Sequence, residues 1–273
     1  MRSLFAALFA ILVIAMPAMA ANQDAISNSP APTYDQPVPG PRFNWNRAAL
    51  FDNGPVFNSA GTGPGGSNES VLQDASLGMS TYGHGQQISV NNTMSDDFSV
   101  PAGETWNVQD FVFFGYQTGS TTGLSTFTDV RFEILDGPPG SPTSAVVYGD
   151  LTTNALSTSA WSNCYRTLES TPGATNRPIM ANTCNAVFSL PAGHYWVVTQ
   201  AGGSLSSGPW YPPTAIWNVC ATGDALQGLA GVYTQTADGS TGCPLGIPFL
   251  IHGDIAATPT QTSTWGRIKG MFR

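Results

Sequence analysis

Short runs of alternating apolar and polar residues, separated by Gly- and Pro-rich turns, dominate this sequence. The clearest run covers residues 128–135. In it, Val130, Phe132 and Ile134 alternate with polar residues. A period of two predicts a β-strand with one face in the core and the other in water. No segment of useful length shows the period of an amphipathic helix, so the sequence predicts an all-β fold.

A second run, residues 106–116, is apolar on both faces because Phe111 and Phe113 lie between the apolar residues of the other face. This pattern predicts a central strand that is covered on both sides. Similar runs predict further strands at 48–51, 86–90, 145–148, 161–168, 179–182, 186–190, 195–200, 215–219 and 249–252. Short strands joined by Gly/Pro turns are typical of a two-sheet antiparallel sandwich, here expected to be jelly-roll-like.

Two segments of the chain resemble each other. Residues 100–108 and 190–198 both contain an apolar residue, Pro-Ala-Gly, and then Trp and Val at matching positions. We interpret each as a turn followed by a strand. Two copies are too few for a solenoid, which needs at least three stacked repeats, so shared turn chemistry is the preferred explanation.

The ends of the chain differ in composition from its middle. Residues 1–20 combine one Arg, a short apolar run and Ala18-Met19-Ala20, which predicts a signal peptide and a secreted or cell-surface protein. We expect a Pro-rich linker at 21–43, the β-sandwich domain at 44–255, and a Thr-rich linker with a short basic tail at 256–273. The tail is interpreted either as a sorting tag or as a solubilising end. No apolar run is long enough to predict membrane insertion.

The charge of the chain limits its partners. Seventeen acidic residues outweigh nine basic ones, and the formal net charge is −8. An excess of negative charge repels phosphate backbones and anionic lipids. The sequence therefore predicts no binding to nucleic acid and no polybasic membrane docking.

All four cysteines lie in the second half of the chain, at Cys164, Cys184, Cys220 and Cys243. In an exported protein they predict two disulfides, for which three pairings are possible. We favour Cys164–Cys184 and Cys220–Cys243 because each closes a local loop. A zinc site is disfavoured, since no two cysteines have C-x-x-C spacing and the three histidines are scattered.

Several aspartates could bind Ca²⁺, which prefers six to eight oxygen ligands. Asp96 and Asp97 precede a predicted strand, and Asp254 or Asp136 could approach them from another loop. Adjacent residues of a strand point to opposite faces, so the pair offers one or two ligands at most. In the alternative interpretation, these carboxylates accept hydrogen bonds from loop amides and no cofactor binds.

Aromatic residues gather in the Pro-rich segment 206–217, at Trp210, Tyr211 and Trp217. Rigid aromatic rings at a surface can stack on sugar rings, which makes these residues candidate ligand-binding residues. If they pack against the sheet instead, they belong to the core.

Known catalytic signatures are missing from the sequence. It has no G-x-S-x-G, no H-E-x-x-H and no phosphate-binding Gly loop, and we assign no catalytic residue. Asp129, Glu133 and Glu169 could serve a hydrolase only if two of them faced one cleft, about 5 to 10 Å apart.

Several motifs, taken in order, carry a resemblance to a known group: Phe51-Asp-Asn-Gly-Pro, Asp96-Asp-Phe-Ser-Val-Pro-Ala-Gly, Asp136-Gly-Pro-Pro-Gly and Leu190-Pro-Ala-Gly-His-Tyr-Trp. From Trp45 to Asp254 the chain resembles a group of secreted bacterial β-sandwich proteins, most of them uncharacterised. The resemblance implies export and a jelly-roll-like fold, and it brings no catalytic residues.

These observations favour a secreted, non-catalytic binding or surface module whose partners are extracellular glycans or other cell-envelope components. A secreted hydrolase that acts on polysaccharide or protein is the alternative. A structural protein of the cell envelope is a third possibility. A deep cleft with paired carboxylates would favour the enzyme, and an aromatic binding surface would favour the module.

Overall fold

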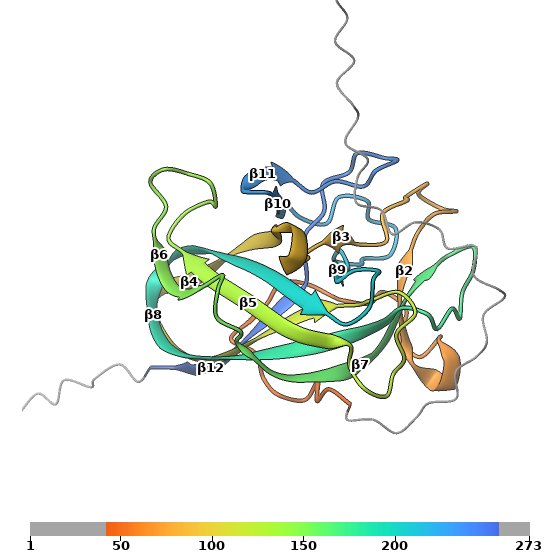
Figure 1. Cartoon of the computed structure of the whole chain (residues 1–273), viewed down its shortest axis with the longest axis horizontal. Helices are drawn as coiled ribbons and strands as arrows, with labels where there is room; N and C mark the ends of the chain where they lie inside the picture. The colour runs from red at the N-terminus through yellow and green to blue at the C-terminus, as the bar shows by residue number, and fades with distance from the viewer. Residues whose placement is uncertain (1–41, 257–273) are drawn as a thin grey trace, which may run out of the picture.

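The computed structural model describes residues 42–256, and the regular secondary structure of this part of the chain consists almost entirely of β-strands, which are joined by loops (Figure 1). It has no α-helix, only two short 3-10 turns, η1 (Pro64–Gly66) and η2 (Ile88–Val90). The all-β prediction is therefore confirmed. Neither of these two turns is long and apolar enough to cross a membrane, and residues 42–256 contain no other helix. The predicted signal peptide, nearly all of the predicted linker and nearly all of the predicted tail lie outside the described residues.

Twelve strands are described: β1 (Phe51–Asp52), β2 (Asn68–Leu72), β3 (His84–Gly85), β4 (Asn92–Gly115), β5 (Phe127–Leu135), β6 (Val146–Asp150), β7 (Leu156–Leu168), β8 (Pro178–Gly203), β9 (Trp210–Tyr211), β10 (Leu226–Leu229), β11 (Val232–Gln235) and β12 (Phe249–Ile255). The strand predicted at 128–135 is confirmed as β5. The three strands predicted between 179 and 200 are parts of the single long strand β8.

Two of the predicted strands are wrong. Residues 86–90 end in the turn η2, because Asn91 adopts a left-handed conformation that stops an extended strand. Residues 215–219 form an irregular loop after Pro212 and Pro213, and proline interrupts the hydrogen bonding of a strand.

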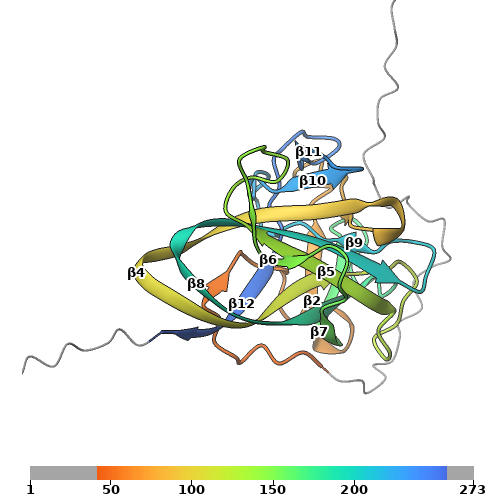
Figure 2. The ribbon, with the colours of Figure 1, turned by 60° about the vertical axis from the view of Figure 1, so that its left-hand side comes forward.

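The long strands β4 and β8 determine the architecture. They pair antiparallel along most of their length, and register shifts separate Val100 from Thr105 in β4. The repeated Pro-Ala-Gly segments lie opposite each other at this point, where Val100 pairs with Gly193 and Thr105 with Pro191. Figure 2 shows both strands turning back at the left-hand end of the molecule. The shared turn chemistry thus bends two neighbouring strands at the same place.

The bend divides one hydrogen-bonded sheet into two layers. The first layer contains the N-terminal part of β4 and the C-terminal part of β8, with β10, β11, β5 and β6. The second contains the other halves of β4 and β8, with β1, β12, β7 and β2. The predicted two sheets are therefore two halves of one sheet. The pairing of β2 with β7 is parallel, a departure from the predicted antiparallel arrangement.

Aromatic side chains fill the space between the layers. Phe98 of the first layer lies 6.2 Å from Phe111 and 6.2 Å from Phe249 of the second, measured between ring centroids. Phe132 of the first layer lies 5.1 Å from Phe111 and 5.4 Å from Phe113. All five rings are buried, and aromatic pairs at these separations stabilise a core beyond their burial alone. These contacts make the fold a sandwich.

One predicted disulfide is confirmed and one is wrong. Cys220 and Cys243 are bonded, whereas Cys164 and Cys184 are free and buried. In the pairing of β7 with β8, Cys164 lies opposite Ile179. Cys184 is five residues beyond Ile179 along β8, roughly 16 Å at 3.3 Å per residue, and a disulfide needs Cα atoms within about 7 Å. Burial raises the pKa of both free thiols, which makes them unreactive.

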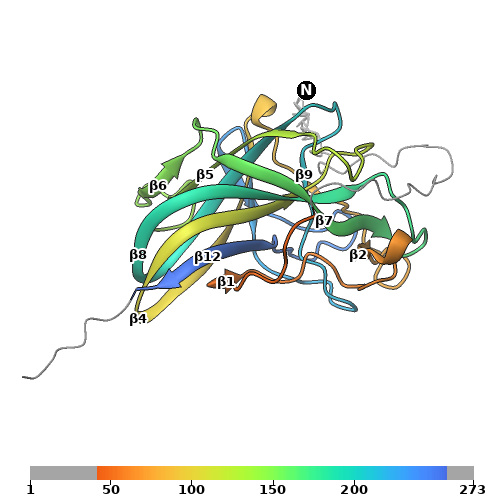
Figure 3. The same cartoon turned by 90° about the horizontal axis from the view of Figure 1, so that it is seen from below.

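One side of the sandwich is open. The strand β6 is the last strand of the first layer. In the second layer, β7 begins at Leu156 opposite Cys184, so residues 185–191 of β8 pair only with β4 among the described strands. Figure 3 shows β6 and the bend of β8 at the same end of the molecule. This opening positions the candidate site.

Candidate functional site

A groove of about 530 Å³ lies on the open side of the sandwich, between β6, the following loop and β8. Its lining includes Phe132, Tyr148, Asp150, Thr153, Asn154 and Asn185. The volume is within the range of about 300 to 1,000 Å³ that is typical of small-molecule sites. We refer to this feature as the β6 groove.

Tyr148, which lines the β6 groove, forms an aromatic pair with Phe188. Tyr148 of β6 pairs in register with Ile134, whose side chain is buried in the core. Because residues opposite each other in a sheet point to the same face, Tyr148 also points towards the core side. Its ring stacks on that of Phe188 from β8, with centroids 3.9 Å apart and planes inclined by 10°. The stacked pair holds the half-buried Tyr148 ring in a fixed orientation.

The loop after β6 is held by side chains that bind its own backbone. The Asp150 carboxylate accepts hydrogen bonds from the backbone N–H of Thr152 at 2.7 Å and of Thr153 at 2.6 Å, and from both threonine hydroxyls. Asn154 Oδ1 accepts from the N–H of Val130 at 3.1 Å and of Leu156 at 3.0 Å. These contacts give the wall of the β6 groove a defined shape without a bound ligand.

The β6 groove carries negative charge. Hydrogen bonds from Thr152 and Thr153 hold the pKa of Asp150 well below its usual range, so its carboxylate is ionised. Asp150 is the only ionisable residue with an acidic or basic side chain among the residues that line the groove. The other polar lining groups are neutral hydroxyls and amides.

The structure separates the three predicted aromatic residues. Tyr211 has no exposed surface, and its hydroxyl donates to the Pro248 carbonyl at 2.7 Å, so it belongs to the core and the prediction that it binds a ligand is wrong. Trp210 is partly buried, packs against the core and donates to Ser207 Oγ at 3.2 Å. Only Trp217 is largely accessible, with 45% of its surface exposed.

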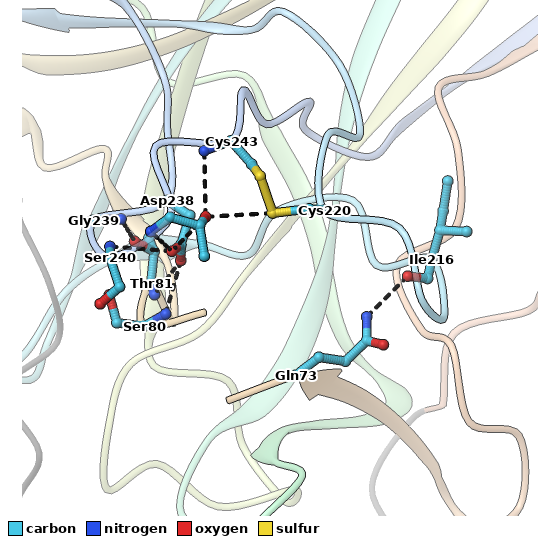
Figure 4. Close-up of a disulfide and its surroundings, with 10 residues drawn as sticks. Gln73, Ser80, Thr81, Ile216, Cys220, Asp238, Gly239, Ser240 and Cys243 are labelled. Atoms are coloured by element: carbon cyan, nitrogen blue, oxygen red, sulfur yellow. Dashed lines mark hydrogen bonds between the residues drawn. A yellow bond between two sulfur atoms is a disulfide. The ribbon is translucent and has the colours of Figure 1, made fainter. Parts of the chain in front are cut away.

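Trp217 lies in a loop that is fixed on both sides. Gln73 Nε2 donates to the Ile216 carbonyl at 3.0 Å, and Gln73 Oε1 accepts from the Asn218 N–H at 2.7 Å. The Cys220–Cys243 disulfide follows directly (Figure 4). Gln73 follows β2, which pairs with the C-terminal end of β7, whereas the β6 groove includes Leu156 at its N-terminal end. Trp217 and the groove are therefore separate candidate surfaces.

The predicted calcium ligands are only partly brought together. Oxygens of Asp96 and Asp97 lie within 4.8 Å of one another and of an oxygen of Asp224, which the sequence interpretation missed. Asp254 lies elsewhere, in β12, where it accepts a hydrogen bond from Gln109 at 2.8 Å. Its assignment to this site is wrong, because the register of β12 places it beside Asn107 in the second layer, whereas Asp96 and Asp97 lie in the first layer, and Asp254 is not part of the carboxylate group around them.

Asp96 already has hydrogen-bond donors. Its Oδ2 accepts from Asn53 Nδ2 at 2.8 Å and from the Ile247 N–H at 3.0 Å, and its Oδ1 accepts from the Asp97 N–H at 3.0 Å. Burial raises the pKa of Asp96 to about 7, despite these donors. These contacts agree with the alternative interpretation of the sequence in one respect: the Asp96 carboxylate accepts hydrogen bonds from backbone amides.

The raised pKa predicts that stability falls as the pH rises. The folded state holds the Asp96 proton up to about pH 7, whereas the unfolded chain releases it near pH 3.8. Between these values the folded state binds more protons, so we expect the free energy of unfolding to drop by about 2 kcal/mol from pH 5 to pH 8. Urea titrations at several pH values measure this, and Asp96→Asn should flatten the profile.

Asp97→Asn is the matched control, and with it the decline should persist. A profile that stays equally steep in Asp96→Asn would contradict the assignment. Urea titrations repeated with millimolar CaCl₂ test the calcium prediction. A bound cation favours the ionised carboxylate of Asp96, so it would remove the decline of the free energy of unfolding with pH.

A Ser-His-Asp relay lies beside this cluster. His194 Nε2 is 3.1 Å from Asp97 Oδ2, and His194 Nδ1 is 3.1 Å from Ser99 Oγ. Ser99 and His194 are exposed cross-strand neighbours in β4 and β8, and none of the three lines the β6 groove. Because none of the three residues lines the groove, we assign the relay no reaction.

The carboxylates considered for a hydrolase do not meet in one cleft. Asp129 pairs with Arg131 at 2.7 Å, and Glu169 accepts from the Ser76 N–H at 2.7 Å. Neither they nor Glu133 line the β6 groove, where Asp150 is the single carboxylate. Glycoside hydrolysis by the common mechanisms needs two.

No protein-family model, no curated protein and no solved structure matches this chain.

Proposed function

We propose that the protein is a secreted, non-catalytic module that binds glycans in the β6 groove. The observation that carries the proposal is the combination of a rigid aromatic ring, Tyr148, with neutral hydrogen-bonding side chains in one preformed cavity. Sugars present apolar C–H faces and many hydroxyl groups. An aromatic ring covers the former, and hydroxyls and amides bind the latter.

The predicted signal peptide supports a location outside the cytoplasm. The Cys220–Cys243 disulfide is compatible with it, because disulfides persist in oxidising compartments. Extracellular polysaccharides and cell-envelope glycans are the sugars present there.

Binding to a panel of neutral oligosaccharides of the cellulose, α-glucan, xylan and mannan types tests the proposal. We expect at least one type to bind, and Tyr148→Ala to weaken that binding by at least tenfold because the stacking surface is lost. Isothermal titration calorimetry on the folded variants measures the affinity, and thermal melts verify folding.

Tyr148→Phe and Trp217→Ala are the controls. Tyr148→Phe keeps the aromatic ring, and Trp217→Ala removes the other exposed candidate residue. The affinity of both variants for the oligosaccharide should stay within about threefold of that of the parent protein. A loss of binding in Trp217→Ala, with Tyr148→Ala unaffected, would transfer the site to the Trp217 loop. A complete lack of glycan binding would overturn the proposal.

A further inference from the structure

The charged groups around the β6 groove are distributed unevenly. Within the groove, Asp150 is the only charged residue. The nearest basic side chain of β5, Arg131, is occupied. Its Nε and Nη2 donate to Asp129 Oδ2 at 3.1 and 2.7 Å, and its Nη1 donates to the Leu151 carbonyl at 3.4 Å. Among residues 42–256, no residue that lines the groove carries a positive charge.

A second carboxylate, Glu133, lies close to Asp150 on the neighbouring strand. It lies on β5, opposite Gly149 of β6. Burial raises the pKa of Glu133, and the negative charge of Asp150 raises it further. A ligand with carboxylates of its own would meet the same repulsion.

The Asp150 carboxylate is held in one orientation, because rotating it away from a ligand would break its hydrogen bonds. Both of its oxygens accept hydrogen bonds, Oδ1 from Thr152 and Thr153 and Oδ2 from the Thr153 hydroxyl. The preceding residue, Gly149, has φ +75°, and a Cβ there would collide with the Phe132 carbonyl. The backbone thus places the charge at one position on the wall of the groove.

Neutral groups remain for a ligand. Ser157 and Asn185 line the groove and are exposed, and within residues 42–256 their side chains form no hydrogen bond with the protein. A hydroxyl and an amide can each donate to and accept from sugar hydroxyls.

From this arrangement we infer that the β6 groove selects uncharged glycan chains over carboxylated ones, and that Asp150 is the residue that sets this selectivity. The inference rests on the proposed glycan-binding function and adds the class of glycan. Two like charges about 6 Å apart at a partly solvated surface repel by an amount that corresponds to roughly five- to tenfold in affinity.

Matched polymer pairs test the inference with the full chain: hydroxyethyl cellulose against carboxymethyl cellulose, and pullulan against carboxymethyl pullulan. Affinity gel electrophoresis measures the dissociation constants. For the pair that binds, we expect the dissociation constant of the carboxymethyl polymer to be at least fivefold higher than that of the neutral polymer at low salt. This difference should be smaller at 0.5 M NaCl, because salt screens the repulsion.

Asp150→Asn keeps an acceptor for the Thr152 and Thr153 amides and removes the charge. We expect it to narrow the difference within the pair to less than twofold, measured as the ratio of the two dissociation constants in the same variant. Asp74→Asn is the control for charge alone, because Asp74 lies after β2 beside Ser170 and away from the groove. Thermal melts check that both variants fold.

The outcomes separate the two proposals. Equal binding of both polymers, tighter binding of the carboxymethyl polymer, or an unchanged difference in Asp150→Asn would overturn the selectivity and leave glycan binding in place. A loss of neutral-polymer binding in Tyr148→Ala would confirm that the β6 groove is the surface measured. If no polymer and no oligosaccharide binds, the proposed function fails, and the selectivity fails with it.

Discussion

Replacement of Arg166 by methionine is expected to lower the free energy of unfolding by about 3 kcal/mol. Arg166 lies in β7 with 2% of its surface exposed. Its guanidinium donates to the carbonyls of Tyr82 at 2.7 Å, Thr81 at 3.0 Å and Ser70 at 3.2 Å, and to the Ser70 hydroxyl at 3.2 Å. Methionine fills much of the space but cannot donate a hydrogen bond to any of these buried acceptors.

The expected loss is smaller than the sum of the bonds, because burying the guanidinium is itself costly. Burial lowers the pKa of Arg166 to about 10, and the group remains charged at neutral pH. Urea denaturation of the folded variant measures the effect. Arg166→Lys is the matched control: it keeps the charge but cannot reach all four acceptors, so we expect it to lose at least half as much stability. A loss below 1 kcal/mol in Arg166→Met would contradict this role.

Replacement of Asp238 by alanine is expected to cost a similar amount, about 3 kcal/mol. Asp238 is buried, and Figure 4 shows it next to the disulfide. Its Oδ2 accepts from the backbone N–H groups of Ser80 and Thr81, both at 2.8 Å. Its Oδ1 accepts from those of Ser240 at 3.1 Å and Thr241 at 3.0 Å. Alanine leaves all four donors without this acceptor.

The lowered pKa of Asp238 also predicts that the protein loses stability in acid. Burial alone would raise its pKa, but hydrogen bonds from Thr241, Thr81 and Ser80 outweigh burial and lower it. A lowered pKa stabilises the folded state at neutral pH, and this stabilisation disappears as the pH falls below about 4. Asp238→Asn, the control, keeps one acceptor oxygen and should lose about half as much as Asp238→Ala. Equal stability of Asp238→Ala and the parent protein in urea would refute the prediction.

The two residues act on the same segment. Thr81 donates its N–H to Asp238, and its carbonyl accepts from Arg166. One residue therefore connects a buried carboxylate to a buried guanidinium, and it fixes the irregular segment before β3 against β7. Because the two sites share Thr81, the loss in the double variant should be smaller than the sum of the single losses.

Much of the fold could be predicted from the sequence because the strands are strongly patterned. Residues 128–135 alternate, and the structure buries Val130, Phe132 and Ile134 in the core. The bend of β4 and β8 could not be predicted in the same way. Pro-Ala-Gly is a turn signal, and only the pairing between strands shows that both copies act at one place to fold one sheet.

Tertiary contacts explain the other errors. No role was assigned to Arg166 from the sequence, because its guanidinium binds the carbonyls of Ser70, Thr81 and Tyr82, which lie far from it along the chain. The predicted Cys164–Cys184 disulfide depended on loop length, whereas the register of β7 with β8 decides which residues meet. Sequence spacing gives no information on register across a bulge.

The candidate site was harder to predict than the fold. Tyr148 ends a predicted strand, and nothing in its sequence neighbourhood distinguishes it from other aromatic residues. The Trp- and Pro-rich segment gave the stronger local signal, and its Tyr211 proved to be a core residue. The β6 groove exists because β7 begins too late to cover β8, which is a property of strand lengths in space.

Nuclear magnetic resonance tests the central claim, that the β6 groove binds glycans, most directly. A ¹⁵N-labelled sample is titrated with the neutral oligosaccharide that binds in the panel. We predict that the amide signals of Gly149, Asn185 and residues 153–157 shift in proportion to saturation, while those around Trp217 stay in place. Saturable shifts confined to the Trp217 loop, with the groove signals unchanged, would contradict it.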